Sequence, residues 1–388
     1  MDLPTLSANL RRIRNIRGKS QAEVAEAAGI SRVGYRTIEA GEVKPRLDSL
    51  MKIAAALEVR VDQLFGPALT LHGVRFRAQK KMTSREEILA DVARWLDGYC
   101  ELERLLDEKP TFAFARAIRH VASVEPGEER AMLAAAQARA AVGVGEDDLI
   151  RDVCGLLEDH GVKVITPRIA SEGFFGLSVN ERDGGPAVVV NVWERISVER
   201  WIFTAAHELA HLLLHLTAYD VVRTDEDKAE EREADTFAGH FLMPEHLFEK
   251  EWFEARGLPL VERVLKVKRI FRVSYKSVLY RIAARSPTPR DVWIRFQVEY
   301  RKRAGRTLGG ADEPDRLVAG DFRGRPAARV ADEPEHLVES DFMKDRLSRL
   351  VRLAVERGAI TFERAAEILR IDLEQMKDRA RSWQAGGA

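Results

Sequence analysis

The hydrophobic and polar positions of the chain change their spacing several times along its length. Residues 6–65 contain short runs of helical spacing, separated at GKSQ, AAGIS and EAGEVKPR, where glycine with serine or proline ends one helix and begins the next. After a Gly-Pro pair breaks this pattern, apolar residues recur at helical spacing over 83–141. We therefore expect an all-α first domain, residues 1–66, followed by a helical connector, residues 67–145.

Near residue 160 the spacing becomes that of strands. GVKVITPRI and GFFGLSVNERDGGPAVVVNVW contain β-branched and aromatic runs, and NERDGG divides the second stretch as a hairpin turn would. Two strong helical patterns follow, at 198–216 (VERWIFTAAHELAHLLLHL) and 226–244 (EDKAEEREADTFAGHFLMP). A small antiparallel sheet followed by helices predicts an α+β domain over residues 146–285, within a chain that is mostly helical.

The C-terminal part turns basic and contains a duplication. ADEPDRLVAGDF (311–322) recurs as ADEPEHLVESDF (331–342), identical at eight of twelve positions. Two copies are too few for a solenoid, so we interpret them as a duplicated surface or dimer-contact segment. We expect a basic linker at 286–330 and a helical region at 331–388. For that region a plain helical hairpin is favoured over a second DNA reader, because it shows no basic recognition face.

Composition narrows the class of protein. A chain of 388 residues is too long for one ordinary core, and its 62 basic and 62 acidic residues leave no global field that would favour nucleic acid or a membrane. The start, MDLPTLSANLRRIRN, lacks an apolar leader, and no segment approaches about 18 uninterrupted apolar residues. Cys100 and Cys154 lack metal-type spacing and fit a reducing compartment. We expect a cytoplasmic protein without membrane association.

The stretch SQAEVAEAAGISRVGYRTIEAG has the features of a DNA-reading helix–turn–helix. Ser20 can cap the first helix, Ala25 is small where two helices cross, and Gly29 permits the tight turn between them. The second helix would then turn its exposed face to a major groove, presenting Ser31, Arg32, Val33, Arg36 and Thr37. Gln21 and Lys44 are placed to bind phosphates.

This stretch is part of a longer region that resembles a known family. Together with the closing run IAAALEVRVDQLF, it closely resembles the phage-repressor/Cro-like (XRE) family of five-helix DNA-binding domains over residues 6–65. The resemblance implies that Ser31, Arg32, Val33 and Thr37 read bases of a double-stranded operator. Because such domains usually read two half-sites about one helical turn apart, we expect a homodimer.

The helical stretch at 198–216 also contains HELAH, an HExxH motif. His207 and His211 are four residues apart, so both imidazoles project from one face of a helix and can hold one zinc ion. Glu208 is rotated by about 100° from His207. It is therefore placed beside the metal, where it can act as a general base toward zinc-bound water. The apolar neighbours would keep such a site partly dry.

A third ligand is available in the next helix. Glu231 and Asp235 share one helical face, so Glu231 can bind the metal while Asp235 orients a ligating histidine. Glu230 and Glu233 lie off that face, and we take both as solvated. A charged surface helix is the alternative for this run, but its occurrence with HELAH argues against it. Zinc is the expected ion, and manganese or iron would fit the same ligands.

HELAHLLLH followed by EREADTFAGHFLMP resembles the ImmA/IrrE family of metallopeptidases over about residues 146–250. The resemblance implies a minimal gluzincin-like domain that cleaves phage-type or stress-response repressors. It implies His207, His211 and Glu231 as ligands, Glu208 as general base and Asp235 as an orienting residue. His215 ends the motif, but we do not assign it to the metal. His240 and Tyr219 remain alternatives for stabilising the oxyanion.

The two resemblances together predict a transcriptional regulator that carries a zinc-dependent endopeptidase. Such a protein would cleave itself or a partner repressor protein in response to a stress or phage signal, with single-stranded DNA as one activator to test. One alternative is a non-cleaving transcription factor whose metal-bound domain is a sensor or a dimerisation unit. Another is the protease half of a defence or toxin–antitoxin locus, in which the DNA-binding domain serves autoregulation.

Overall fold

The computed structural model divides into two compact units, Met1–Leu71 with Lys81–Arg94, and His72–Lys80 with Trp95–Ala388. None of the helices in the described part of the chain is long and apolar enough to cross a membrane. The structure describes residues 3–16, 19–57, 59, 61–65, 71, 74–78, 85–171, 173–216, 227–310, 312–314, 336–343 and 346–385.

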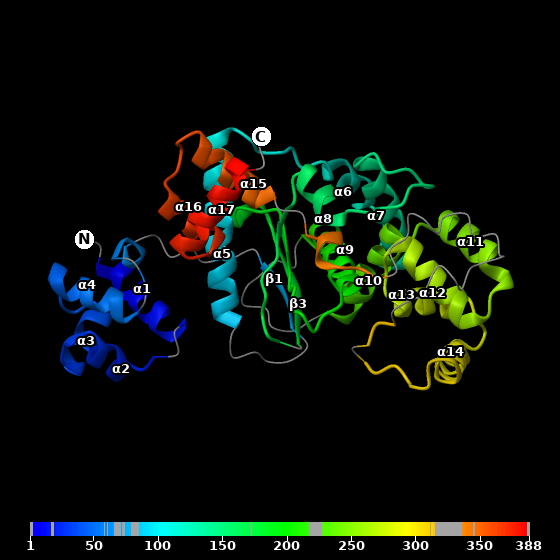
Figure 1. Ribbon diagram of the computed structural model, residues 1–388, viewed down its shortest axis with the longest axis horizontal. Coiled ribbons are helices and arrows are strands. Elements are labelled where there is room, and N and C mark those ends of the chain that lie inside the picture. Colours follow the sequence, from blue (N-terminus) through cyan, green and yellow to red (C-terminus); the bar gives the residue numbers. More distant parts are fainter. Residues whose placement is uncertain are drawn as a thin grey trace. The chain divides into compact units, whose positions relative to one another are not determined.

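The first unit is a small helical bundle, as the sequence predicted (Figure 1). Within described residues 3–65 the fifth predicted helix is a short 3-10 turn, and the elements are α1 (Leu3–Ile16), α2 (Gln21–Ala27), α3 (Arg32–Glu39), α4 (Leu47–Ala56) and η1 (Val61–Leu64). Ser20 and Glu23 form a capping box at the start of α2, and Gly29 takes φ 63 in the turn before α3. The helices enclose a core that includes Leu10 and Tyr35.

The second unit is built on a four-stranded mixed sheet in the order β1-β3-β4-β2. The strands are β1 (Val74–Ala78), β2 (Lys163–Ile165), β3 (Phe174–Val179) and β4 (Ala187–Val190). The β3–β4 pair is antiparallel, as expected, and β1 also pairs with β3 in antiparallel, but β2 pairs with β4 in parallel. The connection from β2 to β3 carries the chain past β4, and therefore β2 cannot form a hairpin with β3.

Strand β1 was not predicted, because it lies in the stretch that we expected to be a helical connector. Its alternating sequence, VRFRA, spans only five residues, which is too short for periodicity to distinguish a strand from a loop. The strand is held by pairing with β3 at the edge of the sheet.

Helices surround one long buried helix, α9 (Val198–Leu214), which lies against β3 and β4 on one side and against α7 and α10 on the other (Figure 1). Nearly every residue of α9 is buried. The helices that follow the sheet or flank α9 are α6 (Ala115–Val121), α7 (Glu128–Ala141), α8 (Val153–Asp159), α10 (Lys228–Leu242), α11 (Glu245–Glu254), α12 (Leu260–Phe271), α13 (Tyr275–Ala284) and α14 (Pro289–Ala304).

The C-terminal region forms three helices, α15 (Arg346–Glu356), α16 (Phe362–Leu369) and α17 (Leu373–Ala385). They share a core with the second half of α5 (Arg85–Leu106), which includes Tyr99 and Leu102. The described parts of the duplicated segment contact the same unit. Glu313 accepts hydrogen bonds from Lys268 Nζ at 2.8 Å and from Ser274 Oγ at 2.7 Å. Phe342 is buried against Trp201. Residues 315–335 lie outside the described part.

A glycine sets how closely α9 approaches the sheet. A Cβ atom at Gly176 in β3 would lie 2.6 Å from Thr204 Cγ2, 2.7 Å from the carbonyl oxygen of Val189 and 3.3 Å from Glu208 Cγ. A backbone oxygen cannot move away as the end of a flexible side chain can. An added Cβ would therefore overlap both the β4 backbone and the Thr204 side chain of α9, with Glu208 beside it, so glycine at position 176 permits the close packing of α9 on the sheet.

We predict that Gly176→Ala lowers the free energy of unfolding of the second unit by about 2 kcal/mol, because the added methyl group overpacks the β3–α9 contact. Gly239→Ala is the matched control: it lies within α10, and an added Cβ there would meet nothing within 4 Å. Removing a glycine from a helix should raise stability by about 0.5–1 kcal/mol. Thermal unfolding of the full chain measures the stability of both variants. If the two substitutions change that stability equally, the close β3–α9 contact does not depend on glycine at position 176.

Candidate metal centre and nucleic-acid interface

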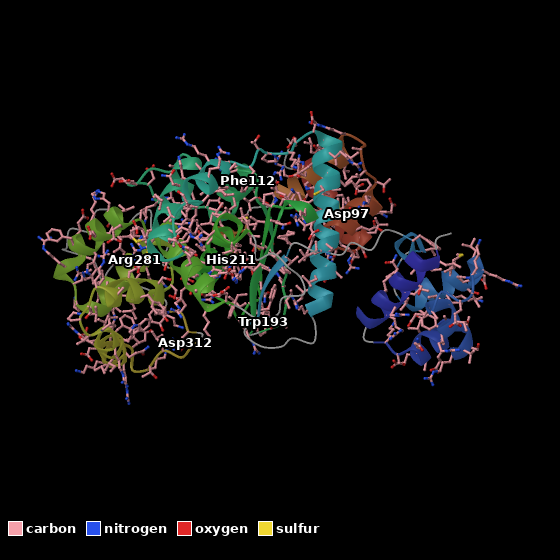
Figure 2. The ribbon with its side chains drawn as sticks, turned by 180° about the vertical axis from the view of Figure 1, so that it is seen from behind. Asp97, Phe112, Trp193, His211, Arg281 and Asp312 are labelled. Atoms are coloured by element: carbon pink, nitrogen blue, oxygen red, sulfur yellow. The ribbon has the colours of Figure 1, made fainter. Side chains whose placement is uncertain are left out.

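The polar residues of the HELAH motif lie inside the apolar helix α9. Ser197 caps this helix by accepting a hydrogen bond from the Arg200 backbone N–H at 3.3 Å. His207 and Glu208 have no exposed surface, and His211 is 1% exposed. Figure 2 shows His211 among the densely packed side chains of the second unit. Burying polar groups in this way is costly unless they are paired or bind a ligand.

Helix α10 brings a carboxylate to the two imidazoles. Asp227 caps α10, accepting from the Ala229 N–H at 2.8 Å, and Glu231 lies in its first turn. The Glu231 oxygens lie 3.3 Å from His207 Nε2 and 3.3 Å from His211 Nε2. The two Nε2 atoms are 3.0 Å apart. The structure therefore brings together the three residues that the sequence predicted as ligands.

These separations suit one metal ion. Ligand atoms about 2.0–2.1 Å from a tetrahedral zinc ion are about 3.3 Å from one another. One nitrogen or oxygen atom from each of His207, His211 and Glu231 falls within 4.8 Å of the others, with the distances given above close to the tetrahedral value. Two imidazoles and one carboxylate form a donor set that leaves a fourth position for water or substrate, so these residues fit a catalytic divalent cation.

The surroundings favour the ligand forms of these side chains. Burial holds the pKa of His211 well below its ordinary value, which keeps the imidazole neutral. Burial alone would raise the pKa of Glu231, but the adjacent side chains of His207 and His211 hold that pKa far below its usual range. A neutral imidazole and an ionised carboxylate are the forms that bind a metal.

Asp235 lies one turn beyond Glu231 and contacts the other side of the first histidine. Its Oδ1 atom is 2.8 Å from His207 Nδ1, and His207 Nε2 faces Glu231. This is the arrangement predicted for an orienting carboxylate.

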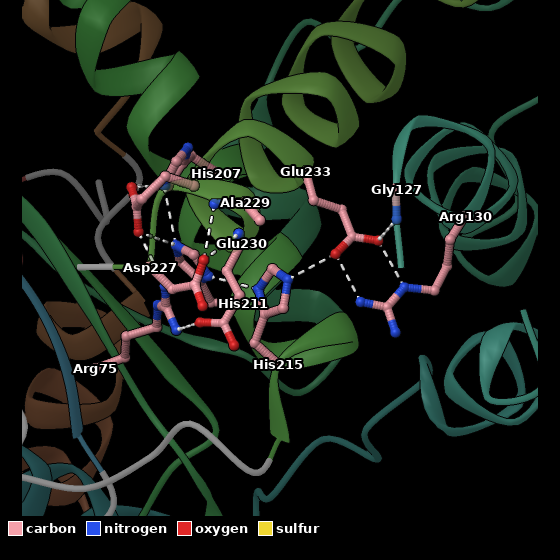
Figure 3. A network of polar contacts seen from close by, with 11 residues as sticks. Arg75, Gly127, Arg130, His207, His211, His215, Asp227, Ala229, Glu230 and Glu233 are labelled. Carbon is pink, nitrogen blue, oxygen red and sulfur yellow. Dashed lines mark hydrogen bonds and ion pairs between the residues drawn. The ribbon is translucent and has the colours of Figure 1, made fainter. Parts of the chain in front are cut away.

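Two carboxylates that we took as solvated are in fact paired (Figure 3). Glu233 is 4% exposed; it accepts from Arg130 Nε and Nη2, both at 2.6 Å, and lies 3.0 Å from His215 Nε2. Glu230 forms an ion pair with Arg75. A helical pattern shows which face a residue occupies but not what packs on that face. The partners come from α7 and β1, to which the sequence assigned no chemistry.

Sequence reasoning therefore missed several residues around the ligands. Arg75 Nη2 donates to Glu231 Oε1 at 3.0 Å, and nothing in the sequence around β1 indicated this contact. His215 did carry a signal, because it follows His211 by four residues and so lies on the same helical face. In the structure its Nδ1 atom is 2.8 Å from His211 Nδ1.

The residues considered for oxyanion stabilisation gain no support. His240 lies nine residues after Glu231 on α10, which places it about half a turn round the helix from the ligand. Burial, with the nearby charges of Arg281 and Arg285, lowers the pKa of His240 to about 3. Tyr219 lies outside the described residues.

The first unit presents the predicted reading residues on the exposed side of α3. Val33 is 64% exposed, and the others on this face are exposed or half-buried: Ser31, Arg32, Arg36 and Thr37. The Ser31 side chain also caps α3 by accepting from the Gly34 N–H at 3.0 Å. Lys44 is exposed in the loop before α4. The helix thus offers a free outer face.

A buried ion pair fixes that helix to its neighbours. Glu39, at the end of α3, is 2% exposed and accepts from Arg14 Nε at 2.7 Å and Nη2 at 3.0 Å. The Gln21 amide, which we expected at a phosphate, donates to Glu39 Oε1 at 2.9 Å. In this structure the Gln21 side chain therefore joins α2 to α3.

Comparisons with known proteins match both units. Residues 10–64 match the helix-turn-helix family model, and residues 157–283 match the model of the IrrE N-terminal-like domain, a peptidase family. The cryptic phage CTXphi transcriptional repressor RstR of Vibrio cholerae serotype O1 is 44% identical over 59 residues, which are 15% of this chain and 50% of that protein. The chain thus spans about half the length of this curated relative.

The helix-turn-helix match covers α2, α3 and the turn at Gly29, and the peptidase-family match covers strands β2, β3 and β4 with α9 and α10, but not β1. Each match therefore includes the residues on which the corresponding prediction was based. The chain thus carries a region similar to helix-turn-helix domains, including that of a phage repressor, and a second region similar to the IrrE N-terminal-like peptidase domain.

Proposed function

We propose that the protein is a DNA-binding transcriptional regulator whose second unit is a zinc-dependent endopeptidase. The observation that carries the proposal is the cluster of His207, His211 and Glu231, in which one ligand atom from each residue lies within 4.8 Å of the others, as three ligands of one ion would. Manganese or iron would fit the same donors. A divalent cation held there supplies Lewis acidity toward a peptide carbonyl.

The residues beside the ligands have separate tasks. Glu208 takes a proton from the attacking water on one of its carboxylate oxygens and returns it to the leaving amine nitrogen. The close β3–α9 contact at Gly176 fixes where the Glu208 side chain begins. Asp235 orients His207 through its Nδ1 atom. The buried surroundings exclude water and strengthen each of these interactions.

The first unit supports a role in regulation. Its exposed α3 residues would contact bases in the major groove of an operator, and Lys44 would contact a phosphate. The likeness to a phage repressor supports this assignment and suggests that the substrate is a repressor, either this chain or a partner. A homodimer would read two half-sites. A stress or phage signal, with single-stranded DNA among the activators tested, would release cleavage.

We predict that Glu208→Gln abolishes cleavage and leaves metal content unchanged, because the amide cannot accept the proton and Glu208 is not a ligand. Intact mass of the zinc-loaded full chain, with and without single- and double-stranded DNA, detects self-cleavage. Adding a phage-type repressor tests cleavage in trans. Glu158→Gln, another buried carboxylate of the second unit, should cleave as the wild type does.

Loss of metal from Glu208→Gln would show that the role assigned to Glu208 is wrong. If the wild type binds zinc yet leaves both substrates whole with every DNA, the second unit is a sensor or a dimerisation unit without turnover.

We predict that Arg32→Ala weakens binding to an operator selected from random duplexes by about 5- to 150-fold, equivalent to about 1–3 kcal/mol for a base contact. Lys44→Ala should weaken binding to all duplexes alike and reduce the salt slope by about 1. Lys52→Ala removes an exposed lysine paired with Asp48 on α4 and serves as the control. Fluorescence anisotropy at several salt concentrations measures the DNA affinity of all three variants. Equal losses of affinity in Arg32→Ala and Lys52→Ala would show that the exposed face of α3 does not read bases.

A further inference from the structure

We propose that His215 and Glu233 are positioning residues that fix which ring nitrogen of His211 faces the metal. The inference rests on the proposed metal site and extends it to two residues that are not themselves predicted ligands. Three buried side chains form a continuous series of contacts from α9 to α10 (Figure 3). His211 Nδ1 lies 2.8 Å from His215 Nδ1, and His215 Nε2 lies 3.0 Å from Glu233 Oε2.

The series ends in a firmly held carboxylate. Glu233 Oε1 accepts from Arg130 Nε at 2.6 Å and from the Gly127 backbone N–H at 3.1 Å, and Oε2 accepts from Arg130 Nη2 at 2.6 Å. Both oxygens of Glu233 thus accept from the Arg130 guanidinium, and such a two-point, charge-assisted pair forms with the ionised carboxylate. The carboxylate is therefore ionised and can only accept hydrogen bonds.

The direction of each hydrogen bond follows from that end. Because Glu233 only accepts, His215 Nε2 must carry the hydrogen and donate it. A neutral imidazole has one donor and one acceptor nitrogen, so His215 Nδ1 is the acceptor. His211 Nδ1 must then donate, which leaves the lone pair of His211 on Nε2. That Nε2 atom is the one 3.3 Å from Glu231 Oε1, at the metal site.

If both hydrogen bonds of the series ran in the opposite direction, a reversed order of donors and acceptors, the metal site would be blocked. If His215 donated from Nδ1, His211 Nδ1 would accept and the hydrogen of His211 would lie on Nε2, where the metal must bind. Both histidine ligands are thus oriented by acidic residues of α10, His207 directly by Asp235 and His211 through His215 by Glu233. Partners of this kind typically change metal affinity by about 10- to 100-fold when they are removed.

Three substitutions in the full chain separate positioning from packing. In Glu233→Gln, Arg130 should hold the amide oxygen, so the amide nitrogen would donate to His215 and reverse the order. His215→Leu breaks the series. In His215→Gln, the side-chain oxygen can accept from His211 and the nitrogen can donate to Glu233, which preserves the order. We expect the first two to weaken zinc binding at least tenfold and His215→Gln to remain within about threefold of the wild type.

The matched control is Glu103→Gln. Glu103 is also 4% exposed and also pairs with an arginine, Arg346 at 2.8 Å, but it contacts no histidine in the described part of the chain. This variant measures the cost of neutralising a buried carboxylate, and its zinc affinity should equal that of the wild type. Zinc dissociation constants are measured by competition with a chromophoric chelator, after circular dichroism has shown that each variant is folded.

Nitrogen-15 spectra of the histidine rings report the hydrogen positions without metal. In the zinc-free wild type we expect hydrogen on His211 Nδ1 and His215 Nε2, and the opposite order in Glu233→Gln. Unchanged zinc affinity and unchanged ring spectra in Glu233→Gln would overturn the inference while leaving the metal site intact. Failure of the wild type to bind zinc would instead overturn the proposed function. The ring spectra would still show which nitrogen of His211 and of His215 carries the hydrogen.

Discussion

The second unit depends on the packing of α9 between the sheet and α10. This contact buries the imidazoles of His207 and His211 in an otherwise apolar core, and such groups are stable there only if their hydrogen-bonding requirements are met from neighbouring elements. Helix α10 meets them with Glu231, Glu233 and Asp235, each of which contacts a different histidine or pair of histidines. The side chains that satisfy the core are therefore also those that make a site for a cation.

The elements that hold α9 and α10 come from distant parts of the chain. The chain leaves the first unit at Leu71 and reaches β1 three residues later, and Arg75 of β1 binds Glu231. At the start of α9, Glu199 pairs with Lys268 at 3.0 Å, and Lys268 also binds Glu313. The predicted ligands are thus supported both by the strand next in sequence to the helix-turn-helix unit and by part of the duplicated segment.

The sequence was most informative where residues that can bind a metal also recur at helical spacing. His207, His211, Glu231 and Asp235 could be placed because residues four apart share a helical face, and two such helices follow each other closely. Spacing alone could not show that Glu233 is buried, since that depends on Arg130 from a helix about 100 residues earlier. The helices of the first unit could likewise be predicted from the helix cap at Ser20 and the turn glycine Gly29. Strand β1 and the parallel β2–β4 pair could not be predicted. The partners of short strands depend on tertiary contacts, which the pattern of residues along the chain does not contain.

The proposed function requires that His207, His211 and Glu231 hold one divalent cation. Zinc K-edge X-ray absorption of the zinc-loaded full chain tests it most directly, because it measures the number, type and distance of the atoms bound to the ion. We expect one zinc per chain, with two imidazole nitrogens and carboxylate oxygen at about 2.0–2.2 Å, and loss of the imidazole signal in the double variant His207→Ala/His211→Ala. Sulfur at about 2.3 Å, or an unchanged spectrum in the double variant, would contradict it.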